Sequence, residues 1–236
     1  MKNHFENKYI DDINFDKGSN YFTPILNHIL KKVDAKKICD IGCGNGVFTV
    51  AIKDKIKCQL IGVDSSEYAL HQAKSNGFDE TIKVNDLSSD ILPIESNSQD
   101  LVICKDVLEH LINPVFLIEE ISRILKNEGL ALLHVPNHFP IWGRLKFLFT
   151  NNIDTFSYFP NSERFDFPHI RFFTTKSISN LIKSTDLVFE ENLSYYFVQP
   201  RVVHRLMPLS FKKLLSKIST NNFSEGITYL TSKKQI

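Results

Sequence analysis

The feature that most constrains this chain is a glycine-rich turn near residue 40. Over residues 38–49, alternating apolar and polar residues lead into three glycines at every second position, and an apolar run follows. This pattern is typical of a buried strand that breaks sharply into a helix. Glycine adopts positive φ and lets a ligand lie against the backbone, while the start of a helix offers unpaired N–H groups. The stretch therefore predicts a cofactor-binding turn but does not say which cofactor it binds.

Strands and helices alternate on both sides of this turn, as in α/β proteins. Apolar strands separated by helices predict a parallel sheet covered on both faces, and right-handed crossovers make it doubly wound, with ligands at the carboxyl ends of the strands. The expected fold is a mostly parallel, seven-stranded, Rossmann-like sheet with an aromatic lid insertion. The strands are expected at 37–41, 58–64, 81–86, 100–104, 130–135, 187–198 and 226–233, and the helices at 19–33, 47–55, 65–76 capped by Ser65, 113–129 beginning at Asn113 and Pro114, 174–185 and 210–218.

The length of the chain favours a single domain. With 236 residues, 42% of them hydrophobic, it can bury one large core but is short for two. We expect a single domain over 1–236, whose first part, 1–18, is a polar lead-in. Residues 138–172 hold many aromatics without a steady period and are broken by prolines. They are expected to form an insertion over the site rather than part of the sheet.

Charge and cysteine usage exclude several classes. The 28 basic and 27 acidic residues give a net charge of +1, so no global field attracts nucleic acid or an anionic membrane. No apolar run approaches the ~20 residues of a membrane span, and the N-terminus lacks the apolar core of a signal peptide. A zinc site at Cys39 and Cys43 would need a second Cys or His pair at suitable spacing. Reduced core thiols in a cytoplasmic protein are expected instead, at Cys39, Cys43, Cys58 and Cys104.

Three strand ends point to a nucleoside-bearing cofactor. Asp64 ends the second strand, where a carboxylate can accept both hydroxyl hydrogens of a ribose. A dinucleotide turn reads G-x-G-x-x-G, but here the glycines are alternate and Val47 stands where the last glycine would be. The third strand ends in Asn85-Asp86-Leu87, a carboxylate for an exocyclic amine followed by an apolar side chain for a base face.

In these motifs the chain resembles the class I S-adenosylmethionine-dependent methyltransferases, closely over 19–136 and more loosely over 169–236. Residues 39–46 match the family's D-x-G-x-G-x-G motif, Asp64 its ribose acid and Asp86 its adenine-contacting acid, and Asp100 opens its fourth motif. Singly, Gly42 could serve packing, Asp64 could cap a helix and Asp86 could be a solvated loop residue. The resemblance implies S-adenosylmethionine as cofactor, held by Asp40, Gly42, Cys43, Gly44, Gly46, Asp64, Ser65, Asp86, Leu87 and Lys105.

Lys105 departs from what this resemblance implies. The family places the residue after the fourth strand close to the sulfonium of the cofactor, and here that residue is a lysine. Because a cation is repelled by the sulfonium, we expect the Lys105 side chain to point elsewhere, or only its backbone to be used.

Candidate catalytic residues follow the fourth strand. Asp106, Glu109 and His110, spaced at i, i+3 and i+4, would share one side of a helical turn. The run is similar to the acid-x-x-Glu-His segment of ubiquinone-type O-methyltransferases, and that resemblance implies a divalent metal such as Mg²⁺, which would orient a diol acceptor. Three roles stay open: this metal site, His110 as general base beside Glu109, or a structural role in which Glu109 and His110 pin the loop.

The 138–172 insertion is the expected lid. Its aromatics and interleaved basic residues could wall a pocket for a flat or apolar acceptor and bind a phosphate or carboxylate, or could form the core of a small cap. Its segment 141–149 is also compatible with peripheral contact with a membrane. The basic residues are Arg144, Lys146, Arg164, His169 and Arg171.

The expected function is methyl transfer from S-adenosylmethionine to an oxygen, less favourably a nitrogen, of a small molecule such as a sugar or a lipid-linked intermediate. One alternative is a non-catalytic module that binds the cofactor. Another is an RNA methyltransferase, disfavoured because no appended RNA-binding module is visible. The sequence predicts neither the acceptor nor the oligomeric state. A basic face for RNA would lie around Arg201, Arg205, Lys212, Lys213 and Lys217.

Overall fold

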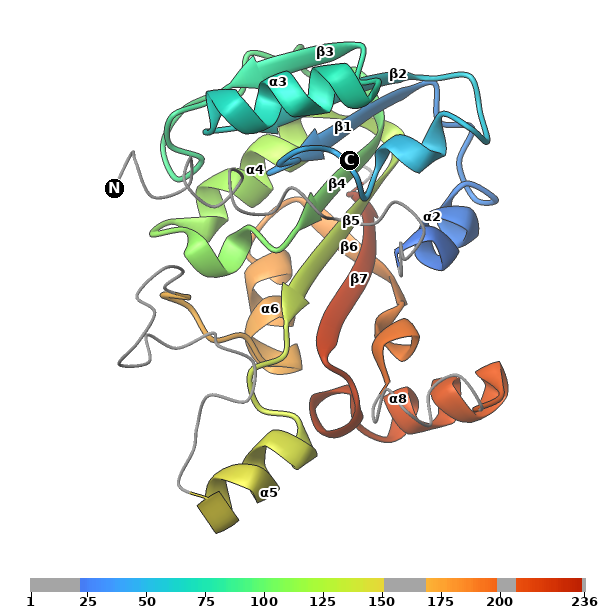
Figure 1. Ribbon diagram of the computed structural model, residues 1–236, viewed down its shortest axis with the longest axis vertical. Helices are drawn as coiled ribbons and strands as arrows, with labels where there is room; N and C mark the ends of the chain where they lie inside the picture. Colours follow the sequence, from blue (N-terminus) through green and yellow to red (C-terminus); the bar gives the residue numbers. More distant parts are fainter. Residues whose placement is uncertain (1–21, 151–168, 199–206, 235–236) are drawn as a thin grey trace.

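The computed structural model describes residues 22–150, 169–198 and 207–234. They are organised around a seven-stranded sheet in the order β3-β2-β1-β4-β5-β7-β6 (Figure 1). The strands from β1 to β5 pair in parallel, and β7 is antiparallel to both β5 and β6. The mostly parallel, doubly wound α/β sheet is therefore confirmed. Its strands are β1 (Lys37–Ile41), β2 (Gln59–Asp64), β3 (Glu80–Lys83), β4 (Gln99–Lys105), β5 (Leu125–Pro136), β6 (Leu187–Asn192) and β7 (Gly226–Lys233).

Helices cover both faces of the sheet because alternate strand residues point to opposite sides. On one face, Cys39 and Val102 pack in a core cluster with residues of the helices α4 and α6. On the other face, Ile38 and Leu60 pack in a second cluster with residues of α2 and α3. Both faces are thus apolar and buried, as a parallel sheet requires. The helices are α2 (Thr23–Ile29), α3 (Glu67–Asn76), α4 (Pro114–Ile124), α5 (Ile141–Thr150), α6 (Thr175–Lys183) and α8 (Leu209–Phe223).

Local capping chemistry sets several helix ends. Asn113 caps α4 as predicted, its side chain accepting the N–H of Phe116 at 3.4 Å with Pro114 at the first helical position. The cap of α3 is Ser66 rather than Ser65, because the Ser66 hydroxyl accepts the N–H of Ala69 at 3.2 Å. The predicted cap was therefore one residue early.

Several predicted element boundaries were wrong. The strand predicted over 81–86 ends at Lys83, so Asp86 lies in the following loop. Three others have identifiable reasons. The 47–55 helix is replaced by turns and a short 3₁₀-helix, η2 (Val50–Ile52), where the Thr49 hydroxyl bonds to Asp40. The helix predicted to reach residue 129 ends at Ile124, because Leu125 is extended and pairs with Gln99 of β4. The strand predicted over 187–198 ends at Asn192, and the 3₁₀-helix η4 (Ser194–Phe197) follows.

Parts of the sequence-based expectation lie outside the described residues. These are the 1–18 lead-in, the start of the 19–33 helix, most of the 138–172 insertion, and the basic residues Arg164, Arg201 and Arg205. The described start of the insertion forms α5. Within the described ranges, every helix is too short or too polar to cross a bilayer.

Candidate functional site

The predicted site residues gather at one edge of the sheet. The neighbouring parallel strands β1, β2 and β4 end at Ile41, Asp64 and Lys105. The carboxyl ends of parallel strands meet at the same edge, which is where open α/β sheets bind ligands. The glycine turn, Asp64 and the residues after β4 therefore border one site.

The turn after β1 requires glycine. Gly42, Gly44 and Gly46 have φ values of 70°, 54° and 77°, in the left-handed region that other residues rarely adopt. A Cβ on Gly42 would lie 2.2 Å from a methyl of Val107, and one on Gly46 would lie 2.3 Å from the ring of Phe78. The turn therefore brings bare backbone to the site and packs too tightly for side chains.

Asp64 ties this turn to the start of α3. Its carboxylate oxygens accept the N–H of Gly44 and the N–H of Ser66, both at 2.9 Å, and the side chain is buried. Asp64 therefore holds the residue that caps α3, while Ser66 itself is the cap. Whether Asp64 also binds a ribose stays a prediction.

Asp40 brings a second buried carboxylate to the turn. Its side chain accepts a 2.5 Å hydrogen bond from the Thr49 hydroxyl. Burial raises the pKa of Asp40 to about 7, although the Thr49 bond and the nearby Lys105 ammonium oppose the shift. Asp40 is therefore only partly ionised at neutral pH, and a further cation nearby would favour its charged form.

Lys105 pairs with its neighbour Asp106. Its ammonium forms an ion pair with the Asp106 carboxylate and lies 4.5 Å from the ring centroid of Phe48. The positive charge of Lys105 is thus paired with the Asp106 carboxylate at the carboxyl end of β4. Whether Lys105 faces the cofactor stays a prediction.

Asp106 does not join Glu109 and His110 on a helical turn, so that expectation was wrong. Its φ of 54° reverses the chain, and the 3₁₀-helix η3 (Leu108–His110) begins only afterwards. Its carboxylate lies 3.4 Å from Nε2 of His134. Burial alone would raise the pKa of Asp106, but the charges of Lys105 and His134 hold it down at about 2.

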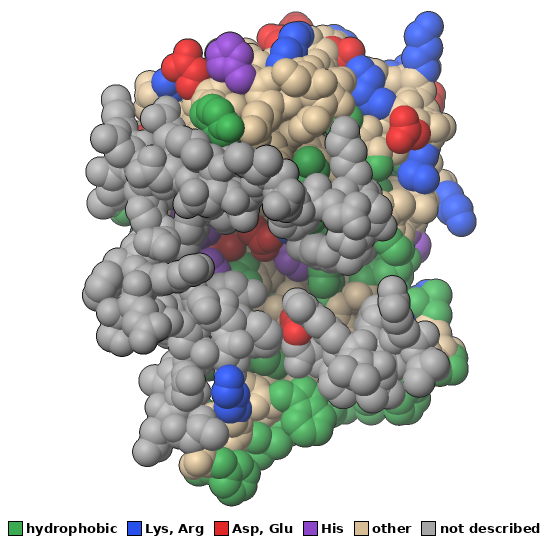
Figure 2. Space-filling model, in the orientation of Figure 1, with side chains coloured by type: hydrophobic (Ala, Val, Ile, Leu, Met, Phe, Trp, Pro, Cys, Tyr) green, Lys and Arg blue, Asp and Glu red, His purple; other side chains and the backbone are tan. Residues whose placement is uncertain are grey.

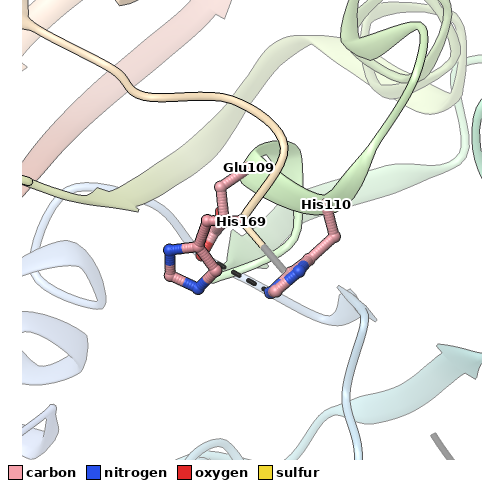
Figure 3. Close-up of side chains that lie close together, drawn as sticks. All are labelled: Glu109, His110 and His169. Carbon is pink, nitrogen blue, oxygen red and sulfur yellow. Dashed lines mark ion pairs between the residues drawn. The ribbon is translucent and has the colours of Figure 1, made fainter. Parts of the chain in front are cut away.

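A cluster of histidines lies beyond β4 instead. Glu109, His110 and His169 each offer one atom within 4.8 Å of the others (Figure 3). Glu109 is fully buried, and its Oε1 lies 3.9 Å from Nε2 of His110. Nε2 of His138 lies 2.7 Å from Nδ1 of His169. We call these four residues the histidine cluster.

The sequence did not point to His138 as a site residue, and His169 was predicted only as one of the basic residues of the insertion. His138 follows the end of β5 at Pro136 and so stands near the edge that carries the other site residues. Burial, helped by His110, lowers the pKa of His138 to about 4, so this imidazole is neutral at pH 7. The position of His138 after a strand end was the only sequence signal for it.

The donor atoms of the cluster do not fit the Mg²⁺ considered from the sequence. Mg²⁺ binds oxygen ligands, whereas Glu109, His110 and His169 offer one carboxylate and two imidazoles. Such a set suits Zn²⁺ and similar ions better. With Asp106 turned toward Lys105, the oxygen-rich site implied by the resemblance is not formed.

The remaining predicted site residues differ in how far they are buried. Asp86 is exposed, and its carboxylate accepts the N–H of Ser88 at 2.8 Å, while Leu87 is buried in the core. Ser65 lies half-buried between β2 and the cap of α3. Cys39 and Cys43 belong to the clusters on opposite faces of the sheet, so they do not converge on a shared metal.

The end of the insertion is fastened to the loop after β4. The backbone N–H groups of Ile170 and Arg171 donate to the Glu109 carbonyl at 3.0 and 3.1 Å. The Arg171 guanidinium donates to the carbonyls of Leu111 and Ile112. Arg171 therefore fixes the loop that carries the histidine cluster.

Comparisons with known proteins agree with this geometry. Residues 39–133 match the model of a family described as a methyltransferase domain. Over 119 residues the chain is 26% identical to a ubiquinone biosynthesis O-methyltransferase of Leptothrix cholodnii, covering 49% of this chain and 50% of that protein. Over 124 residues it is 30% identical to a ribosomal protein L11 methyltransferase of Fusobacterium nucleatum, covering 50% of this chain and 39% of that protein.

The fold is shared more widely than the sequence. An S-adenosylmethionine-dependent methyltransferase from Mesorhizobium loti superposes with a TM-score of 0.63 at 16% identity, covering 92% of this chain and 100% of that one. The chain spans about half the length of the curated relatives it matches. The family match includes the glycine turn, Asp64 and His110 but ends before His138.

Proposed function

Because this chain carries a class I S-adenosylmethionine-dependent methyltransferase domain, we propose that it transfers a methyl group to an oxygen of a small-molecule acceptor. One observation carries the proposal: a glycine turn shaped for a ligand and a buried carboxylate–imidazole cluster border the same end of the sheet.

The residues present fit the cofactor. The left-handed glycines offer bare backbone for the methionine part, Asp64 offers carboxylate oxygens for the ribose, and Asp86 with Leu87 borders the expected adenine position. With a pKa of about 7, the buried Asp40 is only partly ionised at neutral pH, and a bound sulfonium would favour its charged form. When bound, the cofactor would supply a methyl group already activated by its positive sulfur.

The task left to the protein is to align the acceptor, exclude water and remove a proton. We assign the proton transfer to His110, whose imidazole would accept the acceptor's hydroxyl proton. The fully buried Glu109, 3.9 Å from Nε2 of His110, would stabilise the imidazolium that forms. His169 and His138 would hold the other side of the acceptor pocket.

An oxygen acceptor is favoured over nitrogen because a hydroxyl needs a base while a neutral amine attacks without one. The similarity to a ubiquinone biosynthesis O-methyltransferase supports the same choice. A sugar or lipid-linked intermediate remains our proposed acceptor class. Nucleic acid is disfavoured by the balanced charge.

The test is mass spectrometry of cell metabolites incubated with the purified protein and methyl-labelled cofactor. We expect labelled product with the natural protein and a product yield at least about 100-fold lower with His110→Ala, the usual contribution of a general base. Cofactor binding by calorimetry without any labelled product would favour the non-catalytic module. Labelled RNA, bound in a salt-dependent way, would favour the RNA methyltransferase.

We also propose that the protein works in the cytoplasm. Cys39, Cys43, Cys58 and Cys104 are free thiols in the structure. Burial raises the pKa of each thiol, so these cysteines stay protonated and unreactive. Such usage is typical of a reducing compartment. Thiol counting on protein extracted under acid-quenched conditions tests this, since a disulfide between any pair would contradict it.

A further inference from the structure

Two helices at one end of the molecule, α5 and α8, expose many large apolar side chains. Figure 2 shows this apolar surface at the lower end of the view, where Figure 1 places the two helices. A soluble surface rarely gathers so much apolar area unless it binds something. The exposed apolar side chains are Trp142, Leu145, Phe147, Leu148 and Phe149 on α5, and Leu209, Phe211, Leu214 and Ile218 on α8.

The two helices form a joint surface. The Arg144 guanidinium of α5 donates a hydrogen bond to the side-chain oxygen of Asn222 at the end of α8. Before α5, the side chain of Asn137 donates to the carbonyls of Asn221 and Ser224 at 2.9 and 2.7 Å. We call the exposed face of these two helices the α5–α8 surface.

α8 is anchored by one face and presents the other, whereas none of the residues 141–149 of α5 is buried. On α8, Ser216 and Thr220 are buried, whereas Phe211, Leu214 and Ile218 recur at i, i+3 and i+7 on the exposed side. On α5, Trp142, Leu145 and Phe149 have the same spacing and are all exposed. Each helix therefore carries one exposed apolar stripe, and Phe147 and Leu209 are exposed apolar residues outside these stripes.

The charge on this surface is of one sign. Neither helix contains Asp or Glu, although the whole chain is balanced at 28 basic and 27 acidic residues. Apolar stripes flanked by cations are the pattern of helices that lie in the headgroup layer of an anionic bilayer. The cations on the two helices are Arg144, Lys146, Lys212, Lys213 and Lys217.

We propose that the α5–α8 surface docks this protein on an anionic lipid bilayer, with its apolar stripes at the acyl boundary and its cations among the headgroups. A second copy fits less well, because a two-fold contact would bring the cations of both copies together. The site is separate from the cofactor turn, and the proposal does not depend on methyl transfer.

The only tryptophan of the chain, Trp142, lies on this surface and is 50% exposed. Its fluorescence therefore reports docking directly. On adding vesicles of phosphatidylcholine with phosphatidylglycerol to the full-length protein, we expect a blue shift, because the indole leaves water. Vesicles of phosphatidylcholine alone should give little shift, and raised salt should weaken the anionic response.

Matched variants test the two components of the surface. Leu148→Asp, at a position 70% exposed, should weaken binding about tenfold or more, while Ile91→Asp, at a position 71% exposed elsewhere, should not change it. Lys217→Glu should weaken binding about tenfold, while Lys55→Glu, exposed outside both helices, should not. Thermal melts of all four variants control for folding.

Three results would overturn the proposal. The first is no spectral shift with either vesicle. The second is equal binding to both vesicle types, which would exclude a role of charge, or a loss of binding in Ile91→Asp as large as in Leu148→Asp, which would exclude a specific role of this surface. The third is self-association without lipid, seen by sedimentation velocity and abolished by Leu148→Asp, which would assign the surface to a second copy.

Discussion

Single residues in the turn after β1 have little freedom to change. Gly46 combines a φ of 77° with a ring atom of Phe78 that a Cβ would approach to 2.3 Å. Asp64 and Asp40 add buried carboxylates to the same turn. Substitution of Gly46 should therefore affect stability through backbone strain and packing, while substitution of Asp40 or Asp64 should act through the loss of a buried carboxyl group.

Gly46→Ala should destabilise the protein by about 2 kcal/mol or more, because alanine is strained at this φ and its Cβ must displace the Phe78 ring. The free energy of unfolding in urea measures the effect. Gly143→Ala within α5 is the control, and it should stabilise the helix slightly because alanine favours helix. Equal stability of Gly46→Ala and the natural protein would contradict the geometry of the turn.

The pKa of Asp40 predicts a pH dependence of stability. Burial raises this pKa to about 7, so between pH ~4 and 7 the folded state holds a proton that the unfolded state has lost. Stability from this group is present at low pH and is lost as the pH rises through 7. Asp40→Asn cannot ionise, so it should not lose stability in this way as the pH rises, and its side-chain oxygen can still accept the hydrogen bond from the Thr49 hydroxyl.

The free energy of unfolding of Asp40→Asn minus that of the natural protein should therefore increase between pH 4 and 7, by an amount on the order of a few kcal/mol. Above pH 7 this difference should stay constant. Burial lowers the pKa of His134 to about 4 and gives the opposite slope, but both proteins share it. Urea unfolding at several pH values measures the difference. A constant difference at all pH values would show that Asp40 does not titrate in this range.

At the scale of elements, the strands were the most predictable part. Their apolar runs are continuous because both faces are buried, and β1, β2, β4 and β7 lie within about a residue or two of the predicted ranges. The ends were less accurate for the others, since β3 and β6 end earlier and β5 begins earlier than predicted. Helix boundaries were less predictable, since they depended on side-chain bonds and, at the end of α4, on the pairing of Leu125 with Gln99. The Thr49 bond to Asp40 replaced a helix, and Ser66 rather than Ser65 capped α3.

The position of that cap gives a paired prediction. Ser66→Ala should cost about 1 kcal/mol, because it removes the side chain that accepts the N–H of Ala69. Ser65→Ala, one residue earlier, should change stability by less than about 0.5 kcal/mol. Chemical denaturation of both variants under the same conditions measures the contrast. The reverse order of effects would place the cap at Ser65.

At the scale of the whole molecule, the cofactor half and the acceptor half differ in how far sequence could predict them. The cofactor half uses residues near one another in motifs at strand ends, such as Gly42 and Asp64. The acceptor half joins His110 to His138 and His169, which come from different parts of the chain. Only tertiary packing brings them together, so spacing along the chain could not reveal the cluster.

Cofactor binding should stabilise the whole molecule. At a concentration of S-adenosylhomocysteine about 100 times Kd, folding should gain roughly 2.7 kcal/mol, which for a chain of this size raises Tm by about 5–10 °C. Asp64→Ala should weaken binding by about 1–3 kcal/mol and remove most of this shift. Differential scanning fluorimetry measures both, with the exposed Asp34→Asn as control. An unchanged shift in Asp64→Ala would exclude a ribose contact.

The contact between His138 and His169 has a consequence for how such a protein can change. β5 ends at Pro136, just before His138, and at His169 the chain lies beside the loop after β4. There Nε2 of His138 and Nδ1 of His169 are 2.7 Å apart. We expect that the segment joining the two histidines can be exchanged or lengthened while their contact is kept and the pairing of the strands is unchanged. If the proposed function holds, we expect that exchanging this segment changes which acceptor is methylated, while cofactor binding at the glycine turn is kept.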